Sequence, residues 1–226
     1  MEQLFKIFLT LHIIGGILGI ACGTINIIRK KGDKIHRLIG KGFLYGMLTS
    51  GFISLILASM HPNMFLFIIG IFTIFLVGTG QRYLSLRNLT SGQKPVLIDW
   101  ALTLMMLVSG IVFVGLGINI IFNNDTFGIV FIVFGSVGLF FTRKDFRNYQ
   151  GHIAIKNYWL IEHINRMIAG YIASLTALLV VNGSYFTAYI PTVLLWLLPT
   201  IVLVPFIIYW TRKFKVKIQL VDTPSV

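Results

Sequence analysis

The sequence predicts an all-α polytopic membrane protein, a single transmembrane domain over residues 1–226 with seven transmembrane helices. Hydrophobic residues make up 56% of the chain and charged residues only 12%, whereas charged residues average about a quarter of a soluble domain. The apolar residues form continuous runs of membrane length, without the alternation of a β-barrel strand. Together these observations indicate a chain that is solvated by lipid.

Seven apolar runs follow one another, and each is long enough, or nearly so, to cross a hydrocarbon core of ~30 Å. We expect helices at about 4–28, 37–60, 63–86, 96–121, 127–142, 158–181 and 188–211. The first run lacks the basic start and cleavage site of a signal peptide, so it is interpreted as a spanning helix. The fifth run is the shortest. The connections are all too short to form a second core.

The basic residues give the expected orientation. Of the 19 Lys and Arg residues, only Lys6 falls on the side opposite to the others. The positive-inside rule then places the N-terminus outside and the C-terminus in the cytoplasm, so we expect a multi-pass protein of the plasma membrane. The same rule explains the net charge of +12 without nucleic acid, so the expected partner is the lipid bilayer. The single cysteine, Cys22, allows no internal disulfide.

Glycines recur at four-residue spacing in the first two runs. The first run carries Gly15, Gly19 and Gly23, and the second carries Gly42 and Gly46. Small residues at this spacing let helix backbones approach closely in lipid. We therefore expect the first two helices to pack as an antiparallel pair. A homo-oligomer that uses the same glycine-rich face is the alternative.

Ionisable side chains at membrane depth are costly, and they usually face the interior of a bundle. Six of them fall within about two turns, or ~10 Å, of the inner boundary. These are His36, Arg82, Asp99, Glu162, His163 and Arg166. A further intramembrane polar residue, His12, lies ~24 Å from that boundary and cannot join them. The sequence thus predicts a polar site on the cytoplasmic side, with His12 separate.

The spacing of these residues predicts particular pairs. Arg82 and Asp99 fall at similar depth on successive helices, so an ion pair would make both tolerable. Glu162 and Arg166 are four residues apart, which favours an ion pair within one helix. A simple alternative is that all these charges form one structural network of ion pairs. His36 and His163 then remain, at similar depth on two helices of the same direction.

Two imidazoles in this arrangement predict a bound cofactor, either haem b or a divalent transition metal such as zinc, copper or iron. The residues expected to bind a haem are His36, His163, Arg82 and Arg166, the arginines through the propionates. The residues expected to bind a metal ion are His36, His163, Asp99 and Glu162. The sequence contains no HExxH, CxxC or phosphate-binding glycine motif to decide between them.

Two further functions remain open. A small-solute transporter is one, because a basic inner vestibule suits an anion. A metal-dependent intramembrane hydrolase is the other, since a metal-bound water could act on a lipid-like substrate. The sequence does not decide whether the protein is an enzyme.

Four segments carry a resemblance: LHIIGGILGIACG, HRLIGKGFLYGML, GTGQRYLSLR followed by a proline and then DW, and EHINRMIAGYIASLTA. Together they resemble an uncharacterised family of predicted bacterial integral membrane proteins, a domain of unknown function, over about residues 4–180. The resemblance implies a multi-helix membrane protein, and it makes the expected membrane a bacterial inner membrane. It also implies that His12, His36, Arg82, Asp99 and His163 are motif positions, and it supplies no activity.

Overall fold

The computed structural model describes residues 2–185 and 190–216, and this part of the chain is all-α, as predicted. The α-helices are α1 (Glu2–Ile28), α2 (Lys34–Met60), α3 (Met64–Tyr83), α4 (Leu97–Phe122), α5 (Gly128–Tyr149), α6 (Tyr158–Val181) and α7 (Thr192–Phe214). Two short 3-10 helices, η1 (Leu89–Ser91) and η2 (Gly183–Tyr185), lie in connections. Six of the α-helices, all except α5, are long and apolar enough to cross a membrane. This composition is compatible with an integral membrane protein.

Helix α5 differs most from the sequence prediction. The apolar run predicted a helix over 127–142, but α5 extends to Tyr149 and has 22 residues. Its last two turns include Lys144 and Asp145, which were expected in a cytoplasmic loop. The helix continues because both side chains find oppositely charged partners on α6. The predicted start of the last helix, residue 188, lies outside the described residues, and α7 begins at Thr192.

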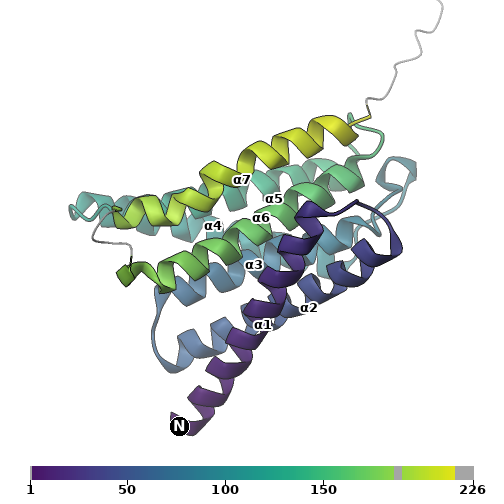
Figure 1. Ribbon diagram of the computed structural model, residues 1–226. Helices are drawn as coiled ribbons and strands as arrows, with labels where there is room; N and C mark the ends of the chain where they lie inside the picture. Colours follow the sequence, from purple (N-terminus) through teal and green to yellow (C-terminus); the bar gives the residue numbers. More distant parts are fainter. Residues whose placement is uncertain (1, 186–189, 217–226) are drawn as a thin grey trace, which may run out of the picture.

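Helix α3 lies at the centre of the bundle (Figure 1). It packs against α2 on one side, α6 on the other, and α4 behind. Helix α1 covers α2, α7 covers α6, and α5 packs mainly against α4. Most residues of α3 are buried, including Ile68, Phe75 and Leu76. Because α3 is apolar on every face, it suits a position surrounded by other helices.

The glycines of α1 and α2 face each other, which confirms the predicted antiparallel pair. A Cβ atom at Gly46 would lie 2.7 Å from the carbonyl oxygen of Gly15 and 2.9 Å from the backbone nitrogen of Gly19. Only glycine permits this approach, since real Cβ contacts are longer. The glycine-rich faces of α1 and α2 therefore contact each other within one chain.

A second glycine contact, which the sequence analysis did not predict, joins α4 and α5. A Cβ atom at Gly135 would lie 2.8 Å from the carbonyl oxygen of Gly110, and Gly117 meets Gly128 further along the pair. The bundle therefore contains two closely packed helical hairpins, α1–α2 and α4–α5, on either side of α3.

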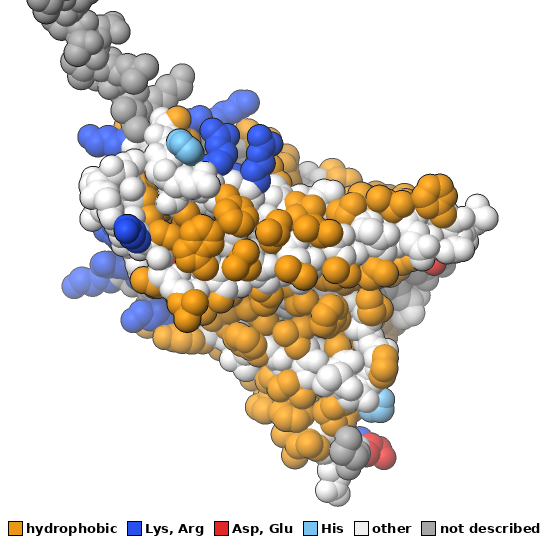
Figure 2. Space-filling view, turned by 180° about the vertical axis from the view of Figure 1, so that it is seen from behind, with side chains coloured by type: hydrophobic (Ala, Val, Ile, Leu, Met, Phe, Trp, Pro, Cys, Tyr) orange, Lys and Arg blue, Asp and Glu red, His pale blue; other side chains and the backbone are white. Residues whose placement is uncertain are grey.

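One end of the bundle is basic, and we call it the basic end. It comprises the connections 29–33, 84–96 and 150–157 and the end of α7 at 212–216. Figure 2 shows Lys and Arg side chains gathered at this end of one face, with hydrophobic side chains over much of the remaining surface. This separation of charge from apolar surface fits a bilayer with the basic end at one of its faces.

The α1–α2 connection at the basic end fixes the start of α2. Asp33 accepts a hydrogen bond of 2.6 Å from the backbone N–H of His36 and contacts Arg29 at 2.8 Å. The N–H bond and the Arg29 guanidinium lower the pKa of Asp33, so the carboxylate stays ionised and caps the helix. Lys31 donates to the carbonyl oxygens of Asn26 and Ile27, each at 2.7 Å. These bonds determine where His36 lies relative to α1.

The glycine contact between α1 and α2 can be tested by adding one methyl group. We expect Gly46→Ala to lower the free energy of unfolding by about 1–3 kcal/mol, because the new Cβ must push the two backbones apart. The measurement is thermal or denaturant unfolding of the purified protein in detergent.

The matched control is Gly115→Ala on α4, where a Cβ atom would meet nothing within 4 Å. This control should be neutral or slightly stabilising. Equal effects of the two substitutions would contradict the close packing of α1 on α2.

Candidate functional site

Arg166 is the most deeply buried charge of the candidate site. Its side chain is 0% exposed, and it lies on α6 two turns from the basic end. The guanidinium Nη2 contacts Asp145 Oδ1 at 2.5 Å, and Nη1 donates to Thr79 Oγ1 at 2.9 Å. Nη2 also donates to the backbone carbonyl of Phe141 at 3.3 Å. These bonds are needed because an unpaired charge at this depth would be strongly destabilising.

Aromatic rings surround the same guanidinium. The Arg166 Cζ atom lies 4.9 Å from the centroids of both the Tyr83 and Phe141 rings, and 5.3 Å from that of Phe75. Ring faces attract a cation, more strongly when water is absent. Arg166 therefore contacts residues of α3 and α5 from its position on α6.

Asp145 is the partner that sequence reasoning missed. It is 0% exposed, accepts hydrogen bonds from Tyr83 Oη at 2.6 Å and Thr103 Oγ1 at 3.2 Å, and binds Arg166. A signal for it was present. Phe134, Gly138 and Phe141 precede it on the buried face of α5, and their spacing continues in helical register to residue 145. The dense charges of residues 143–147 instead favour a loop by composition, and the structure shows helix there.

Glu162 bridges two cations. Its Oε2 lies 3.5 Å from Arg166 Nε, which confirms the predicted ion pair within α6. Its Oε1 forms a second and closer ion pair with Lys144 Nζ of α5. Glu162 therefore links α6 to α5 as well as stabilising α6 itself.

Arg82 and Asp99 form the ion pair that the sequence predicted. Arg82 Nε donates to Asp99 Oδ1 at 2.7 Å, and Nη2 donates to Oδ2 at 3.1 Å. Asp99 Oδ2 also accepts the backbone N–H of Val96 at 2.9 Å, which caps the start of α4. Asp99 is fully buried and Arg82 is partly exposed. This two-point contact joins α3 to α4 at the basic end.

The charges of these ion pairs balance. Three cations pair with three carboxylates, and they join α3, α4, α5 and α6. The members are Arg82, Lys144 and Arg166 with Asp99, Asp145 and Glu162. The ion pairs form two separate sets, Arg82 with Asp99 and Lys144–Glu162–Arg166–Asp145, not the single network of the simple alternative. Because each charge has an opposite partner, both sets support a structural role. Within residues 2–185 and 190–216, no group of three or more His, Cys, Asp or Glu side chains could hold a metal ion.

His163 belongs to neither set of ion pairs. Its Nδ1 atom is 2.9 Å from the backbone carbonyl oxygen of Gly80 on α3. A carbonyl can only accept, so Nδ1 carries the proton and Nε2 of the neutral ring holds a free lone pair. The contact depends on close packing of α3 and α6, since a Cβ at Gly80 would lie 3.0 Å from Cβ of Arg166.

His36 lies at the matching position on α2. Phe43 on α2 contacts α6 beside Gly170, with 3.9 Å between its Cζ atom and the position of an added Cβ. His36 is seven residues before Phe43, and His163 is seven residues before Gly170. Since both helices start at the basic end, the two histidines lie about two turns, ~10 Å, from that contact and at the same level.

The ring of His36 contains an unsatisfied atom. Its Nδ1 is buried and has no hydrogen-bond partner among the described residues. A buried polar atom without a partner costs free energy, and such atoms are uncommon in folded proteins. Two imidazoles therefore lie at one level of the bundle, and Nδ1 of His36 has no partner among the described residues.

His12 occupies a separate place, as expected. Its Nδ1 lies 3.0 Å from both the carbonyl oxygen and the hydroxyl of Ser50 on α2. This histidine therefore joins α1 to α2 in the half of the bundle remote from the basic end. His61, near the same remote end, packs edge-on against the ring of Phe5 at 4.5 Å.

Comparison with family models, with curated proteins and with solved structures finds no match for this chain. The expected membership of an uncharacterised family gains no support from these comparisons. The chemistry of the site must therefore be argued from its own geometry.

The buried ion pair can be tested with one substitution and its partner. We expect Arg166→Met to lower the free energy of unfolding by about 3–5 kcal/mol, because it leaves the Asp145 carboxylate buried without a cation. The double variant Arg166→Met, Asp145→Asn should recover much of this loss, since it removes both charges. Thermal unfolding in detergent measures both effects.

Lys94→Met is the control, because it removes an exposed cation from the same end of the bundle. It should leave the unfolding temperature unchanged. If the double variant unfolds at no higher temperature than Arg166→Met alone, the assigned role of the Asp145–Arg166 pair is wrong.

Proposed function

We propose that this protein is an integral membrane haem-binding protein, with His36 and His163 as the axial ligands of a haem b between α2 and α6. One observation supports this most directly. Two imidazoles lie at the same level, with His163 Nδ1 held by the Gly80 carbonyl and His36 Nδ1 buried without a partner. A hydrogen bond from Nδ1 to a backbone carbonyl fixes the tautomer that leaves Nε2 for an iron ligand. The site can therefore offer two neutral nitrogen donors.

The number of donors favours haem over a bare metal ion. Structural zinc usually takes four protein ligands, and catalytic zinc takes three. Asp99 and Glu162, the carboxylates expected to complete such a set, are already paired with Arg82 and Lys144. A haem brings four nitrogen ligands of its own, so two histidines suffice. When bound, it would supply one-electron transfer at the basic end.

The helices that carry the two histidines meet in an apolar cluster about two turns further along. Phe43, Val77 and Tyr171 form a hydrophobic cluster with Met167 packed against it. Arg82 and Arg166 were expected to bind the propionates, and both remain candidates. However, they are already engaged with Asp99 and Asp145. Two exposed cations on the first turns of α2, Arg37 and Lys41, are better placed to receive these carboxylates.

The transport hypothesis draws less support from the same geometry. An anion pathway needs a cation that the anion can reach, yet Arg166 is fully buried and paired. The hydrolase hypothesis needs a metal-bound water, and the described residues offer no group of three ligands for that metal. Haem binding is therefore the function that we put forward.

We further propose that all seven helices span the membrane, with the N-terminus outside and the basic end in the cytoplasm of a bacterial cell. Helix α5 has 22 residues and so a length of ~33 Å, enough for the hydrocarbon core. Its charged turns face partners on α6 instead of lipid. The collection of cations at one end supports the orientation.

Labelling of single cysteines tests this orientation. In a Cys22→Ser background, a membrane-impermeant maleimide should label Gln3→Cys on intact cells. It should label Lys30→Cys only after the cells are permeabilised, because the basic end faces the cytoplasm. The reverse pattern would mean that the chain is inserted in the opposite orientation.

Haem binding is tested by reconstitution and optical spectroscopy. The purified protein with added haem should show a Soret band typical of two axial histidines. His36→Ala and His163→Ala should each lower haem affinity by about tenfold or more, because each removes an axial ligand. The controls His61→Ala and His152→Ala remove exposed histidines elsewhere and should leave the spectrum unchanged.

Elemental analysis of the protein as purified separates haem from a bare metal. In a contrary result, the protein would contain stoichiometric zinc or copper, show no Soret band, and lose the metal in His36→Ala and His163→Ala. That result would identify a metal site instead of a haem site. The absence of both a Soret band and a bound metal would reject the proposed function.

A further inference from the structure

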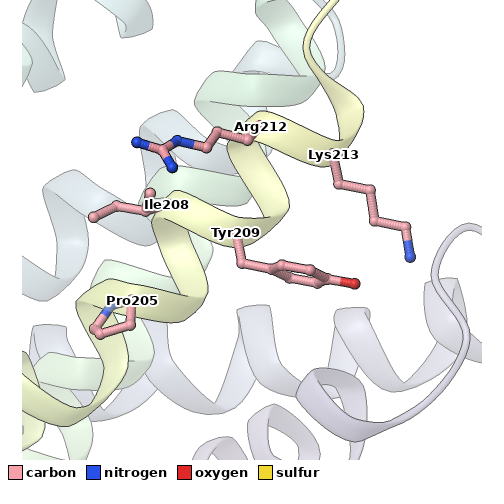
Figure 3. A pocket seen from close by; sticks show the side chains of 5 residues that line it. All are labelled: Pro205, Ile208, Tyr209, Arg212 and Lys213. Carbon is pink, nitrogen blue, oxygen red and sulfur yellow. The ribbon is translucent and has the colours of Figure 1, made fainter.

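A groove runs along the outer face of α7 at the basic end (Figure 3). It has a volume of about 580 Å³ and is lined by Pro205, Ile208, Tyr209, Arg212 and Lys213. The groove is open on one side, and Ile208 and Tyr209 are exposed. It therefore lies where lipid would contact the protein, separate from the two histidines of the proposed haem site.

The lining residues change from apolar to cationic along the helix. In Figure 3, Pro205, Ile208 and Arg212 lie along one side of α7, and Tyr209 and Lys213 lie along the next. Residues spaced by three and four share a face. The apolar part is therefore directed toward the middle of the bilayer, and the cations lie at its surface. A ligand that fills this groove must be amphipathic.

Within residues 2–185 and 190–216, no acidic side chain pairs with the cations of the groove. No acidic residue lines the groove, and none of the ion pairs among the described residues includes Arg212 or Lys213. Lys213 Nζ lies 5.0 Å from the Trp210 ring, and Lys31 Nζ approaches the same ring at 4.7 Å. Positive charge thus accumulates around the groove, and an anion would offset it.

We propose that this groove binds one anionic phospholipid of the leaflet at the basic end. The headgroup would lie over the basic end of the groove, where Arg212 and Lys213 leave α7 on opposite sides and together offset its charge. An acyl chain would follow Ile208 and Pro205 toward the middle of the bilayer. A zwitterionic lipid carries no net charge to offset the cations, and a free phosphate would leave the apolar part empty. The proposal rests on membrane insertion and does not require the haem.

Native mass spectrometry of the purified protein tests this site. The protein in detergent is titrated with phosphatidylglycerol or with phosphatidylcholine that carries the same acyl chains. The wild type should retain phosphatidylglycerol more strongly. The double variant Arg212→Gln, Lys213→Gln should lower that affinity by about tenfold or more, because two basic contacts with the headgroup are lost.

The control Lys94→Gln, Arg143→Gln removes the same charge from exposed positions that do not line the groove. It should retain wild-type affinity. Equal losses in both double variants would indicate general attraction of anionic lipid and overturn the proposal. So would equal retention of the two lipids, or unchanged affinity in Arg212→Gln, Lys213→Gln.

Two measurements on the wild type keep the proposal testable if the groove variant does not fold. A photoreactive phosphatidylglycerol should label residues within 205–213, and labelling only elsewhere would reject the site. Soluble glycerol phosphate should fail to displace the lipid, because it lacks acyl chains. Displacement by glycerol phosphate would identify a soluble phosphate ligand instead.

Discussion

The burial of Arg166 is the constraint on which the rest of the bundle depends. A guanidinium cannot stay in a lipid-solvated fold unless each of its faces meets a charge, a hydrogen-bond acceptor or a ring. Here α3 supplies Thr79 and Tyr83, and α5 supplies Asp145. Asp145 is satisfied in turn by Thr103 of α4. Four helices are therefore placed by the requirements of one side chain.

This constraint separates the polar residues at the basic end into two classes. Each ion-paired residue has an oppositely charged partner, although Glu162 Oε2 and Arg166 Nε, 3.5 Å apart, form no hydrogen bond among the described residues. His36 and His163 are different, because neither has a charged partner: Nδ1 of His36 is unsatisfied among the described residues, and Nδ1 of His163 meets the Gly80 carbonyl. A site of action is expected where polar atoms are left unsatisfied. The fold thus directs attention to two residues out of the larger set of intramembrane polar groups.

Much of the fold could be predicted from the sequence, because apolar runs of membrane length predict helices. The Arg82–Asp99 and Glu162–Arg166 pairs also followed, since depth and spacing along a helix can be read from residue numbers. Asp145 could not be recognised from hydropathy alone. A charge that faces protein and a charge that faces water look the same in sequence, and its partner Arg166 is 21 residues away on another helix. The availability of the histidine nitrogens likewise depends on the Gly80 carbonyl, which no residue pattern specifies.

The separation of Asp145 from Arg166 also matters for how the chain enters the membrane. Asp145 leaves the ribosome 21 residues before its partner, which at ~5–20 residues per second is an interval of roughly one to four seconds. During this time the end of α5 carries a carboxylate that lipid cannot solvate. If α5 spans the membrane, as we propose, we expect it to wait at the surface and to enter fully only when α6 arrives with the arginine. A pair that stabilises the finished bundle would thereby also order its assembly.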